Sequence, residues 1–168
     1  ARVLSIKANY LVEKLGYEVH ILTQNEGFFP LFYSFNANIT FHDMVLKGNF
    51  FQFFKSYIQG LKSNIKAIKQ DIIVVCDKGL KAYIIHFVLK KNVPLVLEMH
   101  SSKFIEESEI NKNVFSKLLF NSISLLKKNG IERYDRFIVE TKESILEWKV
   151  KDTIAIPNPL WFTTQVLS

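Results

Sequence analysis

Several residue types that define small or cross-linked proteins are scarce in this chain. Its 168 residues include one cysteine, six glycines and four prolines. One cysteine forms no internal disulfide, and because Cys76 lies in an apolar run we expect a reduced, buried thiol. So few glycines and prolines exclude low-complexity segments and long linkers. No Gly-x-Gly-x-x-Gly pattern follows a predicted strand, which argues against a dinucleotide-binding dehydrogenase.

Long hydrophobic runs and metal-ligand spacings are also missing. No apolar stretch reaches the roughly 18 residues that a membrane-spanning helix needs, and the N-terminus carries no signal-peptide pattern. We therefore expect a cytoplasmic protein without a membrane span. No group of His, Cys and Asp residues recurs at metal-ligand spacing, so neither a metal nor a cofactor is expected.

Basic residues, in contrast, exceed acidic residues in this chain. The formal net charge is +6 and the pI is about 9.3. A basic balance favours anionic partners such as phosphates, nucleotides and acidic lipid surfaces, although a lysine-rich surface alone gives the same balance. Nucleic acid is not expected as a partner, because the chain has no zinc spacing, recognition-helix signature or aromatic RNA-binding motif.

Helix-like and strand-like patterns alternate along the sequence. Hydrophobic spacing predicts helices over 2–15, 50–69, 80–91, 110–128 and 141–148, and strands over 17–23, 39–41, 71–76, 95–99, 137–140 and 153–156. Alternating strands and helices imply right-handed crossovers and a parallel sheet that is covered on both faces. The prediction is an α/β fold, Rossmann-like, with α/β/α layers and a mostly parallel sheet, as one domain over 1–156. Residues 157–168 are expected to begin an interdomain linker.

The segment from Pro94 to Lys103 holds the main candidate for chemistry. A short apolar run predicts a buried strand, which ends in Glu98, Met99 and His100. In open parallel sheets, ligands bind outside the carboxyl ends of the strands. A histidine at that place suits a catalytic or substrate-contacting imidazole. The alternative is a histidine that packs at the strand end and bonds to a backbone carbonyl.

Other polar residues near predicted element ends are weaker candidates for substrate binding. Ser101, Ser102 and Lys103 follow the histidine and suit acceptor hydroxyls or phosphate, or else form an ordinary surface loop. Lys78 and Gly79 follow another strand end, where glycine allows close backbone approach to a ligand or simply makes a turn. Arg2 begins the first helix and faces a phosphate in the functional interpretation, or is disordered with the terminus.

The helix predicted over 50–69 combines a basic flank with aromatic residues. Four lysines cluster beside its apolar arc: Lys55, Lys62, Lys66 and Lys69. A basic flank next to aromatics is typical of a helix that lies on an anionic membrane surface. The alternative is a core helix with solvated lysines, because the apolar arc also suits packing on a sheet.

Four stretches of the sequence carry a family resemblance. They are 2–5 with 8–11 and 15–23, then 71–75, then Glu98-Met99-His100-Ser101, and finally 134–139 with the Ile-Pro-Asn-Pro sequence that ends at Pro159. In order and spacing they resemble the N-terminal domain of glycosyltransferase family 4, retaining enzymes of GT-B fold. The resemblance spans nearly the whole chain. Two family features are absent: a first strand with a glycine pair before the first helix, and the C-terminal domain after the hinge.

The resemblance implies a specific function. It implies the acceptor-side half of a bacterial retaining glycosyltransferase of hexosyltransferase type. Such an enzyme transfers a sugar from a nucleotide-sugar to a glycan or lipid-linked acceptor, in polysaccharide biosynthesis. His100 matches the family's active-site histidine, and the lysine flank implies peripheral contact with the inner face of the plasma membrane. The donor pocket lies in the absent half, so the chain alone is expected to be inactive. The alternative is a non-catalytic Rossmann-like module that binds a phosphorylated or anionic ligand, or a protein partner.

Overall fold

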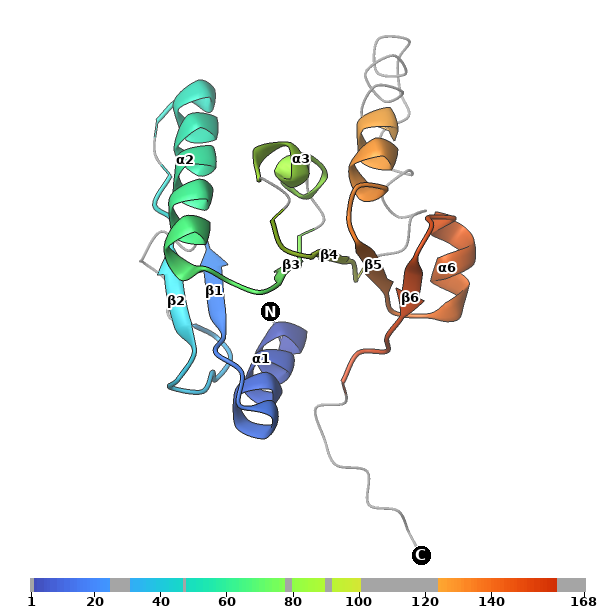
Figure 1. The fold of residues 1–168 in the computed structure, drawn as a ribbon, viewed down its shortest axis with the longest axis horizontal. Coiled ribbons are helices and arrows are strands. Elements are labelled where there is room, and N and C mark those ends of the chain that lie inside the picture. The colour runs from blue at the N-terminus through green and yellow to red at the C-terminus, as the bar shows by residue number, and fades with distance from the viewer. Residues whose placement is uncertain are drawn as a thin grey trace, which may run out of the picture. The chain divides into compact units, whose positions relative to one another are not determined.

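A computed structural model describes residues 2–24, 31–46, 48–77, 80–89, 92–100 and 124–159 (Figure 1). The chain forms two compact units, of which the first contains the described residues up to Lys69 and the second spans Gln70–Pro157. Each unit has its own sheet, and every described strand pair is parallel. Among the described residues, no helix is both long and apolar enough to cross a membrane.

The first unit packs a helix against a two-stranded sheet. Its elements are α1 (Arg2–Leu15), β1 (His20–Thr23), β2 (Thr40–Asp43) and α2 (Phe50–Ile68). Ala8 of α1, Ile21 of β1 and Ile39 form a buried cluster, against which further apolar side chains pack. Gly16 ends α1 with a φ of 66°, a conformation that glycine adopts without steric cost.

Capping interactions define both ends of α2. At the start, the Asn49 side chain accepts a hydrogen bond from the Gln52 amide, and the Gln52 side chain accepts one from the Asn49 amide. This reciprocal pair satisfies two amides that the first helical turn leaves free. At the other end, Lys69 adopts a left-handed conformation and its amide donates to the Ile65 carbonyl. The helix therefore closely matches the range expected from its hydrophobic spacing.

The second unit is a four-stranded parallel sheet with helices. Its elements are β3 (Ile73–Val75), α3 (Leu80–Val88), β4 (Leu95–Glu98), a helical segment over 124–131, β5 (Arg136–Val139), α6 (Lys142–Trp148) and β6 (Thr153–Ala155). The strand order is β3-β4-β5-β6. All residues of β4 are buried, as expected for a strand with a neighbour on each side.

Two polar and steric details fix the amino-terminal side of this sheet. The Asp135 side chain accepts from the Leu95 amide at 2.9 Å, and the Asp135 amide donates to the Leu95 carbonyl at 2.8 Å. These bonds align the starts of β4 and β5. A Cβ atom at Gly130 would lie 2.5 Å from the Tyr83 carbonyl oxygen. The end of the helical segment over 124–131 therefore approaches α3 more closely than any larger residue allows.

The α/β, Rossmann-like class with parallel strands is confirmed, and the helix over 2–15 has the expected bounds. The expected burial of Cys76 is wrong, because this residue follows β3 and is exposed. Ile72 and Val74 are also about half exposed. Among the described strands β3 has a neighbour on one side only, so its apolar run is not covered as that of β4 is. The single domain over 1–156 and the linker over 157–168 stay predictions.

Candidate functional site

Polar residues gather at the carboxyl edge of the four-stranded sheet. Glu98 ends β4, His100 lies two residues beyond it, and Glu140 directly follows β5. In the register of these strands Glu98 is opposite Ile138. Continuing that parallel register by two residues brings His100 beside Glu140. The sheet thus places three titratable side chains from two neighbouring strands at the edge where parallel α/β sheets bind ligands.

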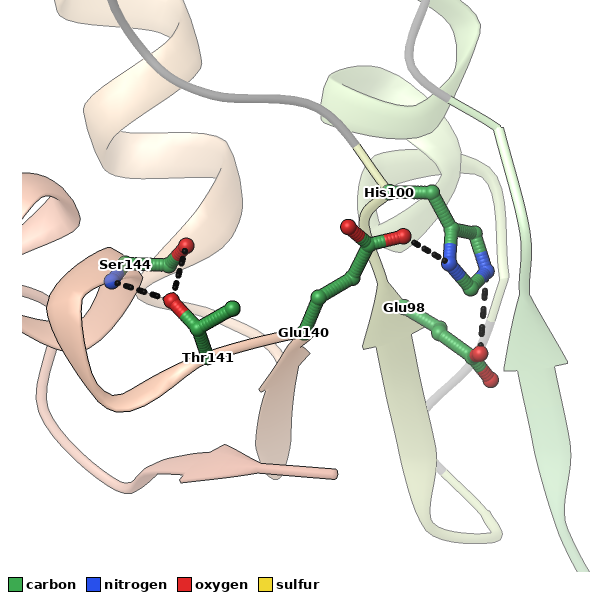
Figure 2. Close-up of polar contacts among 5 residues, drawn as sticks. All are labelled: Glu98, His100, Glu140, Thr141 and Ser144. Carbon is green, nitrogen blue, oxygen red and sulfur yellow. Dashed lines mark hydrogen bonds and ion pairs between the residues drawn. The ribbon is translucent and has the colours of Figure 1, made fainter. Parts of the chain in front are cut away.

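The imidazole of His100 lies between two carboxylates (Figure 2). Its Nε2 is 2.9 Å from Glu98 Oε1, and its Nδ1 is 3.1 Å from Glu140 Oε1. We call these three residues the acid–histidine cluster. Ionised carboxylates only accept hydrogen bonds, so both contacts are hydrogen bonds at the same time only when both ring nitrogens carry protons. In a neutral ring, one nitrogen is available for another donor.

Burial differs within the acid–histidine cluster. The Glu98 side chain is 7% exposed, whereas those of His100 and Glu140 are 34% and 35% exposed. A buried carboxylate requires a compensating partner, and the His100 ring supplies a contact of this kind. Glu98 therefore contacts the ring from the buried side, while about a third of the His100 and Glu140 side chains faces solvent.

The chain after Glu140 is held by the start of α6. The Thr141 hydroxyl accepts from the Ser144 amide at 3.2 Å, which caps the helix (Figure 2). The neighbouring Glu143 accepts a hydrogen bond from its own backbone amide and another from Thr141, and these bonds lower its carboxyl pKa. Glu140 therefore lies between the end of β5 and the capped start of α6, and both elements restrict its backbone.

The cluster is suited to hydrogen bonding and proton transfer. The partly exposed Glu140 carboxylate accepts hydrogen bonds from hydroxyl groups, and an imidazole donates or accepts according to its protonation state. Within the described ranges, no group of three or more His, Cys, Asp or Glu side chains has a geometry that would hold a metal ion.

The first unit contains a different histidine cluster. His20 Nδ1 lies 2.9 Å from His42 Nε2 across β1 and β2, and His20 Nε2 lies 2.8 Å from Glu18 Oε1. Both nitrogens of His20 are therefore engaged. This arrangement links two strands and provides a matched comparison for the contacts of His100.

The other predicted site residues are less informative in the structure. Ser101, Ser102, Lys103, Lys78 and Gly79 lie outside the described residues. Their roles stay predictions.

Arg2 and the lysine flank lie in the first unit. Arg2 is the first residue of α1 and is exposed, and its carbonyl accepts from the Ser5 hydroxyl at 2.8 Å. The lysines of the flank are all exposed, on α2 or at its C-cap: Lys55, Lys62, Lys66 and Lys69. Exposure agrees equally with a membrane-facing flank and with a solvated one.

The acidic partners of His100 were not predicted as site residues. In the sequence, Glu98 lies near the end of one predicted strand and Glu140 at the end of the next. The sequence contains a signal, because a carboxylate is next to last in the predicted strand 95–99 and last in the predicted strand 137–140. The expected alternative of a bond to a backbone carbonyl is not what the described residues show, since both ring nitrogens contact carboxylates.

Comparison with known proteins assigns no family. No protein-family model matches this chain, and a search of curated proteins found no match. The resemblance to glycosyltransferase family 4 therefore depends on the sequence motifs, and functional argument depends on the acid–histidine cluster.

Proposed function

We propose that this chain is the acceptor-side domain of a retaining glycosyltransferase that uses a nucleotide-sugar donor and a glycan or lipid-linked acceptor. The observation that carries the proposal is the acid–histidine cluster at the carboxyl edge of the sheet. Sugars present several hydroxyl groups, and accessible carboxylate oxygens beside an imidazole are suitable partners for them. The order of the sequence motifs, which resembles that of glycosyltransferase family 4, supports sugar transfer as the reaction.

Each member of the cluster has a distinct role in the proposal. Glu140, which is partly exposed, accepts hydrogen bonds from sugar hydroxyls. His100 binds a sugar oxygen near the reacting centre or favours developing negative charge when it is protonated. Glu98 is a positioning residue, because it is buried and reaches the substrate only through the ring of His100. We assign no general base, no metal and no cofactor.

The surface of α2 supports a location at the cytoplasmic face of a membrane. No acidic residue occurs between Phe50 and Ile68, and Phe51 is 81% exposed beside the lysine flank. Lysines attract anionic headgroups, and an exposed aromatic ring inserts among them. In this proposal α2 attaches the first unit to the membrane that holds a lipid-linked acceptor.

The test is turnover by the full-length gene product with a panel of nucleotide-sugars and lipid-linked acceptors. His100→Ala should lower kcat about 100-fold or more, with little change in the thermal midpoint. Glu18→Gln is the control, because it alters a histidine–carboxylate contact of similar length in the first unit. Equal activity of His100→Ala and the wild type contradicts the proposal. If no nucleotide-sugar is turned over but a phosphorylated ligand binds, the chain is a binding module instead.

A further inference from the structure

A pocket lies at the amino-terminal edge of the four-stranded sheet, opposite the acid–histidine cluster. Its volume is about 390 Å³, and we call it the amino-edge pocket. One wall is apolar, formed by Ile73, Leu89, Val93 and Leu95. Ile73 and Leu95 begin β3 and β4, so the pocket is separated from His100 by the length of the strands. The volume falls within the range of about 300–1,000 Å³ that is typical of small-molecule sites.

The side chain of His86, from α3, lines this pocket. Both of its ring nitrogens are shielded from solvent, and neither has a hydrogen-bond partner among the described residues. Most buried polar atoms in proteins are hydrogen-bonded, and an unpaired one costs free energy. Burial, and to a smaller extent the Arg133 guanidinium, lower the pKa of His86. The ring is therefore neutral near pH 7 and offers one donor and one acceptor.

The pocket also carries one side chain of each charge. Glu132 and Arg133 are consecutive residues, and both line it. The Arg133 guanidinium lies 5.2 Å from the centre of the Phe87 ring, which holds the cation on the side of α3. A purely anionic ligand meets repulsion from Glu132, and a purely cationic ligand meets repulsion from Arg133. A ligand with both charges is attracted by both side chains.

We propose that the amino-edge pocket binds a small zwitterion with an apolar body, of the amino-acid class. The ligand carboxylate pairs with Arg133 and its ammonium group with Glu132. Its apolar body contacts the wall that includes Ile73 and Leu95. When the His86 ring turns toward the pocket, one of its shielded nitrogens donates a hydrogen bond to the ligand carboxylate. This binding site is independent of sugar transfer, because it uses a different edge of the sheet and different residues.

Titration followed by NMR tests the proposal with leucine, methionine and phenylalanine as probes. We expect saturable shifts of the His86 ring nitrogens with at least one of them. Isocaproate lacks the ammonium group of leucine, and isoamylamine lacks its carboxylate. Each should bind at least about tenfold more weakly than leucine. If leucine itself is not the probe that binds, the matching desamino and decarboxylated analogues of the binding probe replace them.

Variants locate the binding and control for folding. Arg133→Gln and Glu132→Gln should each weaken binding about tenfold. Lys128→Gln removes a nearby exposed cation that does not line the pocket, so it should bind like the wild type. His86→Leu should also lose affinity while its thermal midpoint stays equal or rises, so the loss is not unfolding.

Three results would overturn the proposal. They are the absence of saturable shifts with all three amino acids, equal binding of the analogue without an ammonium group, and unchanged affinity in Arg133→Gln. His100→Ala should bind the amino acid normally, which keeps the test separate from the proposed sugar transfer.

Discussion

The two edges of the four-stranded sheet each carry a histidine, and the two rings have opposite surroundings. His100 at the carboxyl edge is partly exposed and has a carboxylate oxygen within about 3 Å of each nitrogen. His86 at the amino edge has shielded nitrogens without a partner in the described part of the chain, and a guanidinium nearby. A histidine therefore has carboxylate partners at one edge of the sheet, and a histidine at the other edge has no hydrogen-bond partner among the described residues.

This difference indicates that the two edges of a parallel sheet have different functions. Side chains beyond the carboxyl ends of strands project from the backbone into open space, where they reach ligands. At the amino edge, α3 packs closely on the helical segment over 124–131 and Asp135 bonds to Leu95, so the amino-edge pocket is bordered by packed elements.

The largest effect on stability is expected at the amino edge. Gly130→Ala places a Cβ 2.5 Å from the Tyr83 carbonyl oxygen, so α3 must shift away. We expect the free energy of unfolding to fall by about 2–3 kcal/mol. Denaturant titration measures it, with Asn129→Ala as the control because Asn129 is exposed. A loss below 0.5 kcal/mol, as at ordinary surface sites, would show that the two helices are not closely packed.

The next effect concerns catalysis at the carboxyl edge. Glu98→Gln keeps the shape of the buried side chain but removes the charge beside His100 Nε2. Because Glu98 acts only by positioning, kcat of the full-length protein should fall about tenfold with KM nearly unchanged, and the pH profile of kcat should shift. Glu140→Gln should instead raise KM, because Glu140 contacts the sugar in the proposal. Identical kinetic changes in both variants would contradict these separate roles.

A smaller effect distinguishes a histidine without partners from a bonded one. His86→Leu removes two shielded nitrogens that lack partners, so it should raise the free energy of unfolding by about 1 kcal/mol. His42→Leu removes the ring that lies 2.9 Å from His20 and should lower it by about 1 kcal/mol. Thermal denaturation compares the two variants. Destabilisation by His86→Leu would mean that the ring nitrogens are satisfied by ordered water.

The smallest effect is on the pH dependence of stability. Folding lowers the pKa of His86 below its usual 6.5, so the unfolded chain binds the proton more readily than the folded chain. Above pH 6.5 the His86 proton therefore has no effect on the free energy of unfolding. That free energy decreases as the pH falls through and below 6.5. The stability curve of His86→Leu should be flatter there than that of the wild type. Parallel curves would show that His86 titrates alike in both states.

The sequence predicted the elements better than their surroundings. Apolar spacing and the Gly16 stop predicted α1 with its observed bounds, because both signals are local. The exposure of Cys76 and Val74 was not predictable in this way. Whether an apolar strand is central or has a single neighbour depends on strand order, which short-range periodicity does not encode.

The site was predictable in part for the same reason. The position of His100 after an apolar strand was sufficient to single it out. Its contact with Glu140 depends on the register of β4 with β5, in which Glu98 is opposite Ile138. The amino-edge pocket was not foreseen, because His86 meets Glu132 and Arg133 only after α3 and the turn before β5 come together. Each missed contact joins residues that are distant in sequence.

One comparison tests the central claim, that chemistry occurs at the carboxyl edge, most directly. His100→Ala and His86→Leu are assayed side by side for nucleotide-sugar turnover by the full-length protein, with thermal midpoints measured on the same samples. The account predicts a loss of about 100-fold in His100→Ala and wild-type turnover in His86→Leu, with both variants folded. Wild-type turnover in His100→Ala, or an equal loss in His86→Leu, would contradict it.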